Sequence, residues 1–326
     1  MAVTTTDERL TETGIQDAAE AVSLGMTHHG ARRSWSFGRS RPREGARFRI
    51  ASLTKPFTAT AAVLAARRAD VSLDTPVLEV LPTLAPDWRA DPTISLSHVL
   101  AQASGLSGRV TADEVAALGD GDGVGVASAR LVGRAGSVAR PGDRWAYDNG
   151  NYYVAGAVVA ALNETSYEQA LAELVLQPWG LEDTGFEPSG ELVNGMQGGT
   201  EVPRSSYPRG RRPSGGLCST AADLVTFGER LVADQDLAEQ LARVRTPPGE
   251  IRYGLGWAIG PNGQMYLNGR LPGFRAALVA IPDQRFVAVA LTNDEDALPA
   301  AAGALSVLQM DLTGDDLGPA INDFAA

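Results

Sequence analysis

Residues 48–68 read FRIASLTKPFTATAAVLAARR, and this stretch decides the fold assignment. Its alanine-rich run predicts a helix over about 53–68, with Pro56 in the first turn, where a missing N–H costs little. Ser52 and Lys55 are three residues apart at the start of that helix. Residues at this spacing share one helix face, so we expect the two side chains to lie within reach of each other.

A serine and a lysine placed in this way suggest a nucleophile and its base. A helix N-terminus supplies positive potential and free N–H groups, which lower the pKa of a nearby amine and stabilise an oxyanion. A neutral lysine can then accept the serine proton. Lys55 is also the only lysine in a chain with 28 lysine and arginine residues. Because arginine cannot be deprotonated in a protein, a site that needs a neutral amine cannot accept it.

The two ends of the chain mix helices and strands, whereas the middle is helical. Strands are predicted at 22–28, 33–38, 253–259, 264–268, 275–281 and 286–292. Helices outside the middle are predicted at 8–22, from Ser219 and at 296–311, and those in the middle at 94–103, 111–117, 126–138, 151–162 and 166–176. The predicted fold class is α/β (α+β), an antiparallel sheet flanked by helices. Residues 1–68 and 205–326 form it, and 69–204 form an inserted all-helical domain.

Composition and charge exclude several classes of protein. The net charge of −11 and the pI of about 4.8 argue against nucleic acid, whose phosphates need clustered lysine and arginine. The chain shows neither a secretory signal nor a run of roughly 18 apolar residues, so we expect a cytoplasmic protein with no membrane partner. A single cysteine, Cys218, excludes an internal disulfide. We expect no cofactor and no metal, since His28, His29 and His98 lack metal-ligand spacing.

One local exception to the acidic balance is the segment RSSYPRGRR at 204–212. Two interpretations stay open for its arginines. They form either a solvated loop or a rim that meets an anionic substrate.

A second motif, Tyr147-Asp148-Asn149, lies just before an apolar helix. A tyrosine at the edge of a helical domain can point into an interdomain cleft, where a phenolate near a cation can act as a general base or proton shuttle. The Asn149 side chain offers a donor and an acceptor to substrate or to Lys55. Whether Lys55 or Tyr147 is the base stays open, and a turn with a packed aromatic ring is the alternative interpretation.

The order Ser-Leu-Thr-Lys, Tyr-Asp-Asn and then a strand with a glycine-containing triplet resembles the serine β-lactamase and penicillin-binding-protein superfamily. The resemblance is to the class C-like branch, with its esterases, D-aminopeptidases and transacylases, and it covers nearly the whole chain. Supporting segments are SLDTPVLEVLP (72–82), TISLSHVLAQASGL (93–106), QPWGLEDTGF (177–186), SGGLCSTAADLVTF (214–227), YGLGW (253–257) and LPGFRAALVAIPD (271–283). It implies the β-lactamase/transpeptidase-like fold, with the active site between the two domains and Ser52, Lys55 and Tyr147 as catalytic residues.

The third motif departs from the superfamily pattern. Relatives carry Lys-Thr-Gly or His-Thr-Gly ahead of a Pro-Gly-Phe, whereas this chain has Leu267-Asn268-Gly269. In relatives that cation helps to hold a substrate carboxylate. Leu267 therefore moves the prediction away from β-lactams and D-Ala-D-Ala peptides, although Arg270 or Arg275 could compensate.

The resemblance also assigns the substrate-binding residues. The backbone N–H groups of Ser52 and Arg270 are the implied oxyanion donors, a role that the changed side chain at position 267 leaves intact. Asn149, Asn268 and Gly269 complete the implied substrate-binding site.

The sequence thus predicts a serine hydrolase that acts through an acyl-enzyme on an ester, amide or thioester of a small molecule. It is expected to be more esterase-like than β-lactamase-like. Two alternatives stay open: a biosynthetic acyltransferase (transacylase) of the same fold, and a catalytically reduced acyl-binding or sensory module. The expected partner is a small-molecule acyl substrate, and the sequence does not define the oligomeric state.

Overall fold

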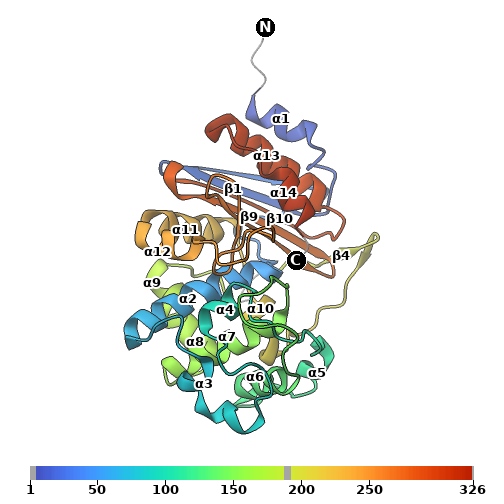
Figure 1. Cartoon of the computed structure of the whole chain (residues 1–326). Helices are drawn as coiled ribbons and strands as arrows, with labels where there is room; N and C mark the ends of the chain where they lie inside the picture. Colours follow the sequence, from blue (N-terminus) through green and yellow to red (C-terminus); the bar gives the residue numbers. More distant parts are fainter. Residues whose placement is uncertain (1–4, 187–191, 325–326) are drawn as a thin grey trace.

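The computed structural model describes residues 5–186 and 192–324, and at its centre lies a six-stranded antiparallel sheet (Figure 1). The strand order is β2-β1-β10-β9-β8-β7. These strands are β1 (Val22–His28), β2 (Ala31–Phe37), β7 (Ala258–Ile259), β8 (Met265–Leu271), β9 (Phe274–Ile281) and β10 (Phe286–Thr292). Because β1 pairs with β10 along its whole length, the first hairpin and the last strands share one sheet, as predicted.

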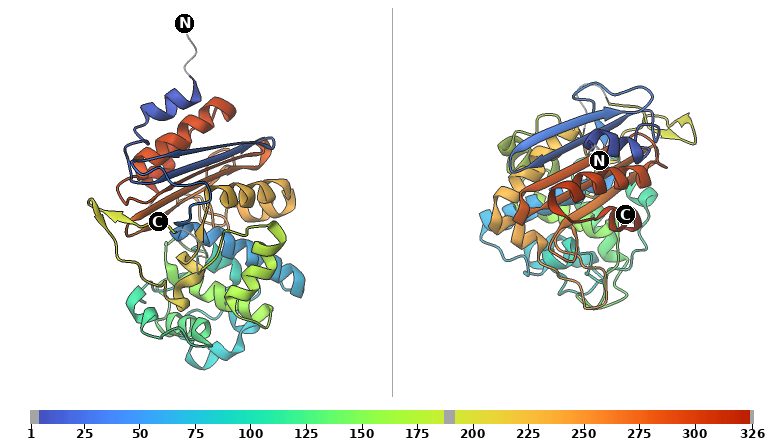
Figure 2. Two further views of the ribbon diagram at one scale, coloured as in Figure 1. Left: turned by 180° about the vertical axis from the view of Figure 1, so that it is seen from behind. Right: turned by 90° about the horizontal axis from the view of Figure 1, so that it is seen from above.

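Helices cover both faces of this sheet (Figures 1 and 2). One face carries α1 (Thr6–Glu12), α13 (Leu298–Thr313) and α14 (Gly318–Asp323), and the other carries α11 (Ala221–Ala233) and the start of α2 (Thr54–Ala69). All residues of β9 and β10 are buried, which explains why these strands are continuous apolar runs. Helix α11 approaches the sheet closely at Gly228, where a Cβ atom would lie 2.4 Å from the Val287 side chain.

A group of helices lies on the other side of α2 from the sheet (Figure 1). Its members are α3 (Val77–Val80), η2 (Pro82–Asp87), α4 (Leu96–Leu100), α5 (Ala112–Ala116), α6 (Val124–Arg134), α7 (Asn149–Leu162), α8 (Tyr167–Leu171), η3 (Ala172–Leu176) and α9 (Gln177–Trp179). Helix α7 is central, because it packs against both α2 and α6 and is buried continuously over residues 150–159. The domain boundaries at 69 and 204 stay a prediction.

The remaining elements are mostly short. They are η1 (Ala51–Leu53), β3 (Phe48–Arg49), β4 (Met196–Gln197), β5 (Thr200–Glu201), η4 (Arg209–Arg211), α10 (Arg212–Gly215), β6 (Cys218–Ser219), α12 (Gln235–Ala242) and η5 (Pro282–Gln284). The β4–β5 hairpin was not predicted, since the region was expected to be all-helical. Its turn passes through Gly198 and Gly199, both with positive φ, a conformation that favours glycine.

Three other elements differ from their predictions. Helix α1 ends at Glu12 instead of residue 22, because Gly14 adopts a left-handed conformation with φ of 74°. The strand predicted at 253–259 is reduced to β7, and α14 was not predicted at all.

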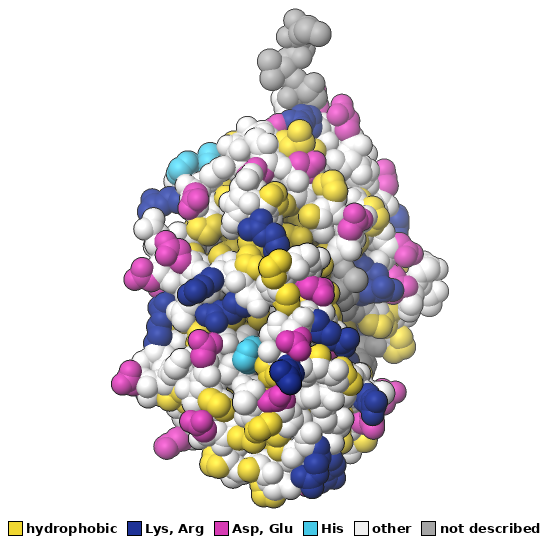
Figure 3. Space-filling model, in the orientation of Figure 1, with side chains coloured by type: hydrophobic (Ala, Val, Ile, Leu, Met, Phe, Trp, Pro, Cys, Tyr) yellow, Lys and Arg dark blue, Asp and Glu magenta, His cyan; other side chains and the backbone are white. Residues whose placement is uncertain are grey.

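Within the described ranges, no helix combines the length and the apolar character that crossing a membrane requires. In the same ranges, no three His, Cys, Asp or Glu side chains are grouped so that they could hold a metal ion. On the face drawn in Figure 3, acidic and basic side chains are interspersed.

Candidate active site

Ser52 lies in η1, the 3-10 turn that leads into α2. The turn is anchored by β3, which pairs with β6, and by the Ile50 N–H, which donates to the Leu217 carbonyl at 3.0 Å. Ala51 has a φ of 49°, which is uncommon for a residue with a Cβ atom. Backbone strain of this kind is concentrated at functional sites. Here it precedes a serine that is only 9% exposed.

Lys55 is completely buried beside this serine. Its Nζ lies 3.1 Å from Ser52 Oγ and donates to the Ser214 carbonyl at 2.8 Å. The two side chains are therefore within reach of each other, as their spacing predicted. Burial lowers the pKa of Lys55 to about 7, although the nearby Asp148 carboxylate opposes this shift. A substantial fraction of the amine is thus neutral at neutral pH.

Tyr147 reaches the same hydroxyl from the loop before α7. Its phenol donates a hydrogen bond to Ser52 Oγ at 2.8 Å. The Lys55 Nζ lies 4.8 Å from the centre of the Tyr147 ring. Burial raises the pKa of Tyr147 well above its usual value of about 10. Tyr147 is therefore a neutral phenol at neutral pH and a proton donor in the resting site.

Gln102 holds the tyrosine loop in place, although sequence reasoning assigned it no function. Its side-chain oxygen accepts from the Asp148 N–H at 3.0 Å and from Asn151 Nδ2 at 2.7 Å. Its backbone carbonyl accepts from the Ala146 N–H at 2.9 Å. Asp148 in turn caps α7 by accepting from the Gly150 N–H at 2.9 Å. The only sequence signal for a role of Gln102 is that it lies in the segment 93–106, which resembles the superfamily.

Replacing Gln102 with methionine is expected to lower the free energy of unfolding by about 2–4 kcal/mol. The side chain keeps its length, but the buried Asn151 Nδ2 and the partly buried Asp148 N–H lose their acceptor. Loss of an acceptor costs about 1–3 kcal/mol, and the partly buried donor falls at the low end of this range. Urea denaturation measures the change. Gln169→Met, at an exposed position on α8, is the matched control and should change stability by less than about 0.5 kcal/mol. Equal stability of the two variants would contradict the structural role of Gln102.

Strand β8 runs directly alongside the backbone of Ser52 at Gly269. A Cβ atom on this residue would lie 2.4 Å from the Ile50 carbonyl oxygen and 3.2 Å from the Ser52 nitrogen. Only glycine therefore lets the strand come this close to the Ser52 amide. The next residue, Arg270, has an exposed side chain and faces Arg275 across the β8–β9 pair. The pairing of the Ser52 and Arg270 N–H groups around an oxyanion stays a prediction.

The two predicted asparagines lie apart from the cluster of Ser52, Lys55 and Tyr147. Asn268 is 2% exposed, and its Nδ2 donates to the carbonyls of Ile321 at 2.6 Å and Phe324 at 2.8 Å. Its amide N–H groups thus anchor the C-terminal segment, which corrects the expectation that they serve substrate. Asn149 is exposed at the first position of α7, where its side chain is open to solvent.

Phe324 brings the C-terminal segment against Tyr147. The Phe324 ring is 4% exposed and lies 6.1 Å from the Tyr147 ring, edge to face. Three further rings surround it, those of Trp145, Tyr253 and Tyr266. Leu267, the first residue of the altered third motif, is also fully buried. This end of the site is therefore apolar, a property that no local sequence pattern around Phe324 could reveal.

Comparison with known proteins identifies the family of this chain and several similar proteins. The model of the Beta-lactamase family matches residues 6–309. Esterase EstB of Burkholderia gladioli is 29% identical over 67% of this chain and 66% of the relative. The putative penicillin-binding protein PbpX of Bacillus subtilis is 26% identical over 70% of this chain and 57% of the relative. The chain thus spans only part of the length of these curated relatives.

Solved structures share the fold over most of the chain. A class C β-lactamase from Rhodobacter sphaeroides has a TM-score of 0.77 at 18% identity, covering 94% of this chain and 99% of that one. The octameric penicillin-binding protein homologue from Pyrococcus abyssi has a TM-score of 0.76 at 23% identity, covering 94% of this chain and 75% of that one. At these identities the likeness concerns the fold, and it confirms the predicted β-lactamase/transpeptidase-like architecture.

Proposed function

Because the chain belongs to the beta-lactamase family, whose members are serine hydrolases, we propose that it hydrolyses a small-molecule ester through an acyl-enzyme on Ser52. The observation that carries this proposal is the buried Lys55 amine, 3.1 Å from Ser52 Oγ, with a pKa of about 7. A base is most effective when its pKa lies near the working pH. Amides and thioesters react through the same steps and remain within the proposal.

In this proposal Lys55, and not Tyr147, is the base. The amine can accept a proton near neutral pH, whereas the raised pKa keeps the Tyr147 phenol protonated. The phenol, bonded to Ser52 Oγ at 2.8 Å, is placed to pass a proton to the leaving group. It then recovers that proton from the Lys55 ammonium, so that the site returns to its resting protonation.

The reaction proceeds in two balanced halves. Ser52 Oγ loses its proton to Lys55 and attacks the carbonyl carbon, and the tetrahedral oxyanion lies between the N–H groups of residues 52 and 270. The carbonyl forms again as the leaving alcohol departs with a proton. Water then attacks the acyl-enzyme and loses its proton to Lys55. The bond between Ser52 Oγ and the acyl carbon breaks, Oγ takes that proton back from the Lys55 ammonium, and the acid is released.

Two observations support an ester over a β-lactam as substrate. The first is Leu267, which removes the cation that relatives use for a substrate carboxylate and leaves a fully buried apolar side chain in its place. The second is the similarity to a relative named as an esterase. The exposed Asn149 and the internally bonded Asn268 leave the backbone of β8 as the principal polar contact for a carbonyl oxygen.

The pH dependence follows from the Lys55 pKa. Below about pH 7 the amine is protonated and cannot accept the serine proton, so kcat/KM should fall about tenfold per pH unit. Above about pH 7 it should level off, because the amine is neutral and Tyr147 remains protonated. Initial rates with 4-nitrophenyl butyrate across this range measure the profile. A profile without this acid limb would contradict Lys55 as the base.

Mass spectrometry tests the proposal itself. The protein is mixed with 4-nitrophenyl butyrate, quenched within the first turnovers and digested, and the butyryl adduct is expected on the peptide that contains Ser52. An adduct on another residue would reject Ser52 as the nucleophile. Absence of both adduct and turnover, across oxygen esters, a thioester and a β-lactam, would favour the acyl-binding module. Faster decay of the adduct with added alcohols than with water would favour the acyltransferase.

A further inference from the structure

The site has two chemically different ends along β8. Gly269 faces the Ser52 amide, and residues of a strand are spaced by about 3.3 Å, so Leu267 and Leu271 lie about 7 Å to either side. The Leu267 end is the apolar one described above. Beyond the other end lies a cavity of about 260 Å³, whose walls include Leu271 and the segment 202–208.

Three arginines line this cavity: Arg49, Arg204 and Arg211. The described residues that line it include no aspartate or glutamate. Arg49 donates to the Ser205 carbonyl, and Arg204 Nε donates to Asn194 Oδ1 at 2.6 Å.

Neutral groups are thus the polar partners of Arg49 and Arg204. Arg211 stacks over the Tyr207 ring at 5.0 Å, and its buried Nε has no hydrogen-bond partner in the described structure. The cavity therefore holds positive charge that the described residues of its walls do not neutralise.

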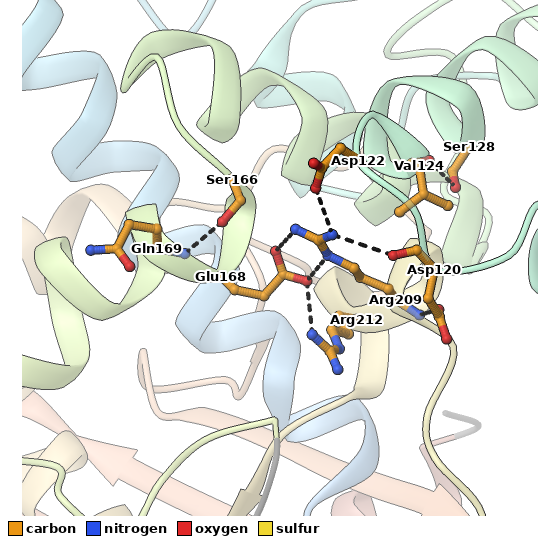
Figure 4. A network of polar contacts seen from close by, with 9 residues as sticks. All are labelled: Asp120, Asp122, Val124, Ser128, Ser166, Glu168, Gln169, Arg209 and Arg212. Carbon is orange, nitrogen blue, oxygen red and sulfur yellow. Dashed lines mark hydrogen bonds and ion pairs between the residues drawn. The ribbon is translucent and has the colours of Figure 1, made fainter.

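The neighbouring arginines of the same run are arranged in the opposite way (Figure 4). Arg209 contacts Glu168 at 2.9 Å and Asp122 at 3.3 Å, and Arg212 contacts Glu168 at 3.0 Å. These two guanidinium groups are neutralised within the protein, although the chain carries a net charge of −11. The segment 204–212 is thus divided: two arginines have a structural use, and Arg204 and Arg211 face the cavity.

One wall of this cavity, formed by Tyr207, also packs close to the backbone next to Ser52. A Cβ atom on Gly215 would lie 2.7 Å from the Tyr207 hydroxyl and 3.7 Å from the Ala51 carbonyl carbon. Gly215 follows Ser214, whose carbonyl accepts the Lys55 hydrogen bond. Tyr207, which lines the arginine cavity, therefore lies close to the backbone that carries Ser52 and to the segment that accepts the Lys55 hydrogen bond.

We propose that the cavity formed by Arg49, Arg204 and Arg211 binds a carboxylate group of the substrate, so that the enzyme acts on anionic esters. Guanidinium groups match carboxylates in geometry, and hydrogen bonds between such charged partners are about twice as strong as neutral ones. The charged group lies beyond Leu271, and the apolar part of the ester lies toward Leu267 and Phe324. This inference rests on the proposed function, because it assigns a substrate class to the same nucleophile.

Matched pairs of esters test the inference. The acyl arm compares the mono-4-nitrophenyl ester of succinic acid with 4-nitrophenyl butyrate, which has the same chain length without the charge. The leaving-group arm compares 4-carboxyphenyl butyrate with 4-carbamoylphenyl butyrate. We expect kcat/KM to be at least about tenfold higher for the charged ester in one arm, and this arm locates the carboxylate relative to the scissile bond.

Arginine substitutions decide whether the cavity causes the preference. Arg204→Gln and Arg211→Gln should each reduce the charged-to-neutral ratio by about tenfold, mainly through KM of the charged ester. Arg68→Gln is the control, because it removes the same charge from an exposed site at the opposite end of α2 and should leave the ratio unchanged.

The outcomes separate this inference from the proposed function. Turnover of all esters without a charge preference would overturn the cavity assignment and leave the hydrolase intact. A preference that survives both cavity substitutions would overturn it equally. If no ester turns over or leaves an adduct on Ser52, the proposed function itself fails.

Discussion

Replacing Lys55 with methionine should lower kcat/KM for 4-nitrophenyl butyrate by about 10³-fold, within the 10²–10⁴ range of general-base catalysis. The amine is the group beside Ser52 Oγ whose pKa of about 7 permits proton transfer at neutral pH. Methionine fills a similar volume in this buried position without a basic nitrogen. Stopped-flow measurement of acylation gives the change in the affected step. Activity within tenfold of the unmodified protein would remove Lys55 from the mechanism.

The same variant carries its own folding control. A lysine whose pKa falls from 10.5 to about 7 on folding is protonated in the unfolded chain and neutral in the folded one between these values. The stability of the unmodified protein relative to Lys55→Met should therefore rise by about 1.4 kcal/mol per pH unit across this window. It should be lowest below about pH 7, where burial of the ammonium is unfavourable. Urea titrations at several pH values measure the difference, and a constant difference would contradict the lowered pKa.

Replacing Gly269 with alanine should lower kcat by about 10²–10³-fold, the usual effect of losing one oxyanion donor. The added Cβ would lie 2.4 Å from the Ile50 carbonyl oxygen and 3.2 Å from the Ser52 nitrogen. Both are backbone atoms that cannot rotate away, so β8 or η1 must shift. A shift of either separates the two N–H groups that are proposed to bind the oxyanion.

Gly125→Ala is the matched control for this substitution. No atom lies within 4 Å of the Cβ position of Gly125, which belongs to helix α6. The control should keep full activity and be more stable by up to about 1 kcal/mol, because alanine is the better helix former. Gly269→Ala should in contrast lose about 1–3 kcal/mol through overpacking. If Gly269→Ala keeps kcat within threefold of the unmodified protein, the close approach of β8 has no catalytic role.

Much of the fold could be predicted from the sequence, because local patterns determine local structure. The apolar runs of β9 and β10 identify buried strands. The predictions failed where a tertiary contact or a single residue governed the outcome. Gly14 ended α1 early, and α14 forms where its carbonyls meet the Asn268 amide, more than 50 residues away in sequence.

The site shows the same division between local and distant causes. The spacing of Ser52 and Lys55 on one helical turn is a local property, and their contact was predictable. The role of Gln102 was not, because its partners Asp148 and Asn151 lie at the start of α7, 46–49 residues further along the chain.

The sequence by itself predicted the contact between Ser52 and Lys55, since helix periodicity depends on neighbouring residues alone, and the resemblance to the β-lactamase superfamily linked Tyr147 to that pair. Only the tertiary structure decided their chemistry. The pKa of Lys55 depends on complete burial, which the packing of distant elements creates. Likewise, Arg209 is neutralised because the fold brings Glu168 to it, whereas Arg211 faces a cavity whose described walls carry no acid. Burial and charge compensation are properties of the whole packed chain, and for this reason they cannot be read from a local segment.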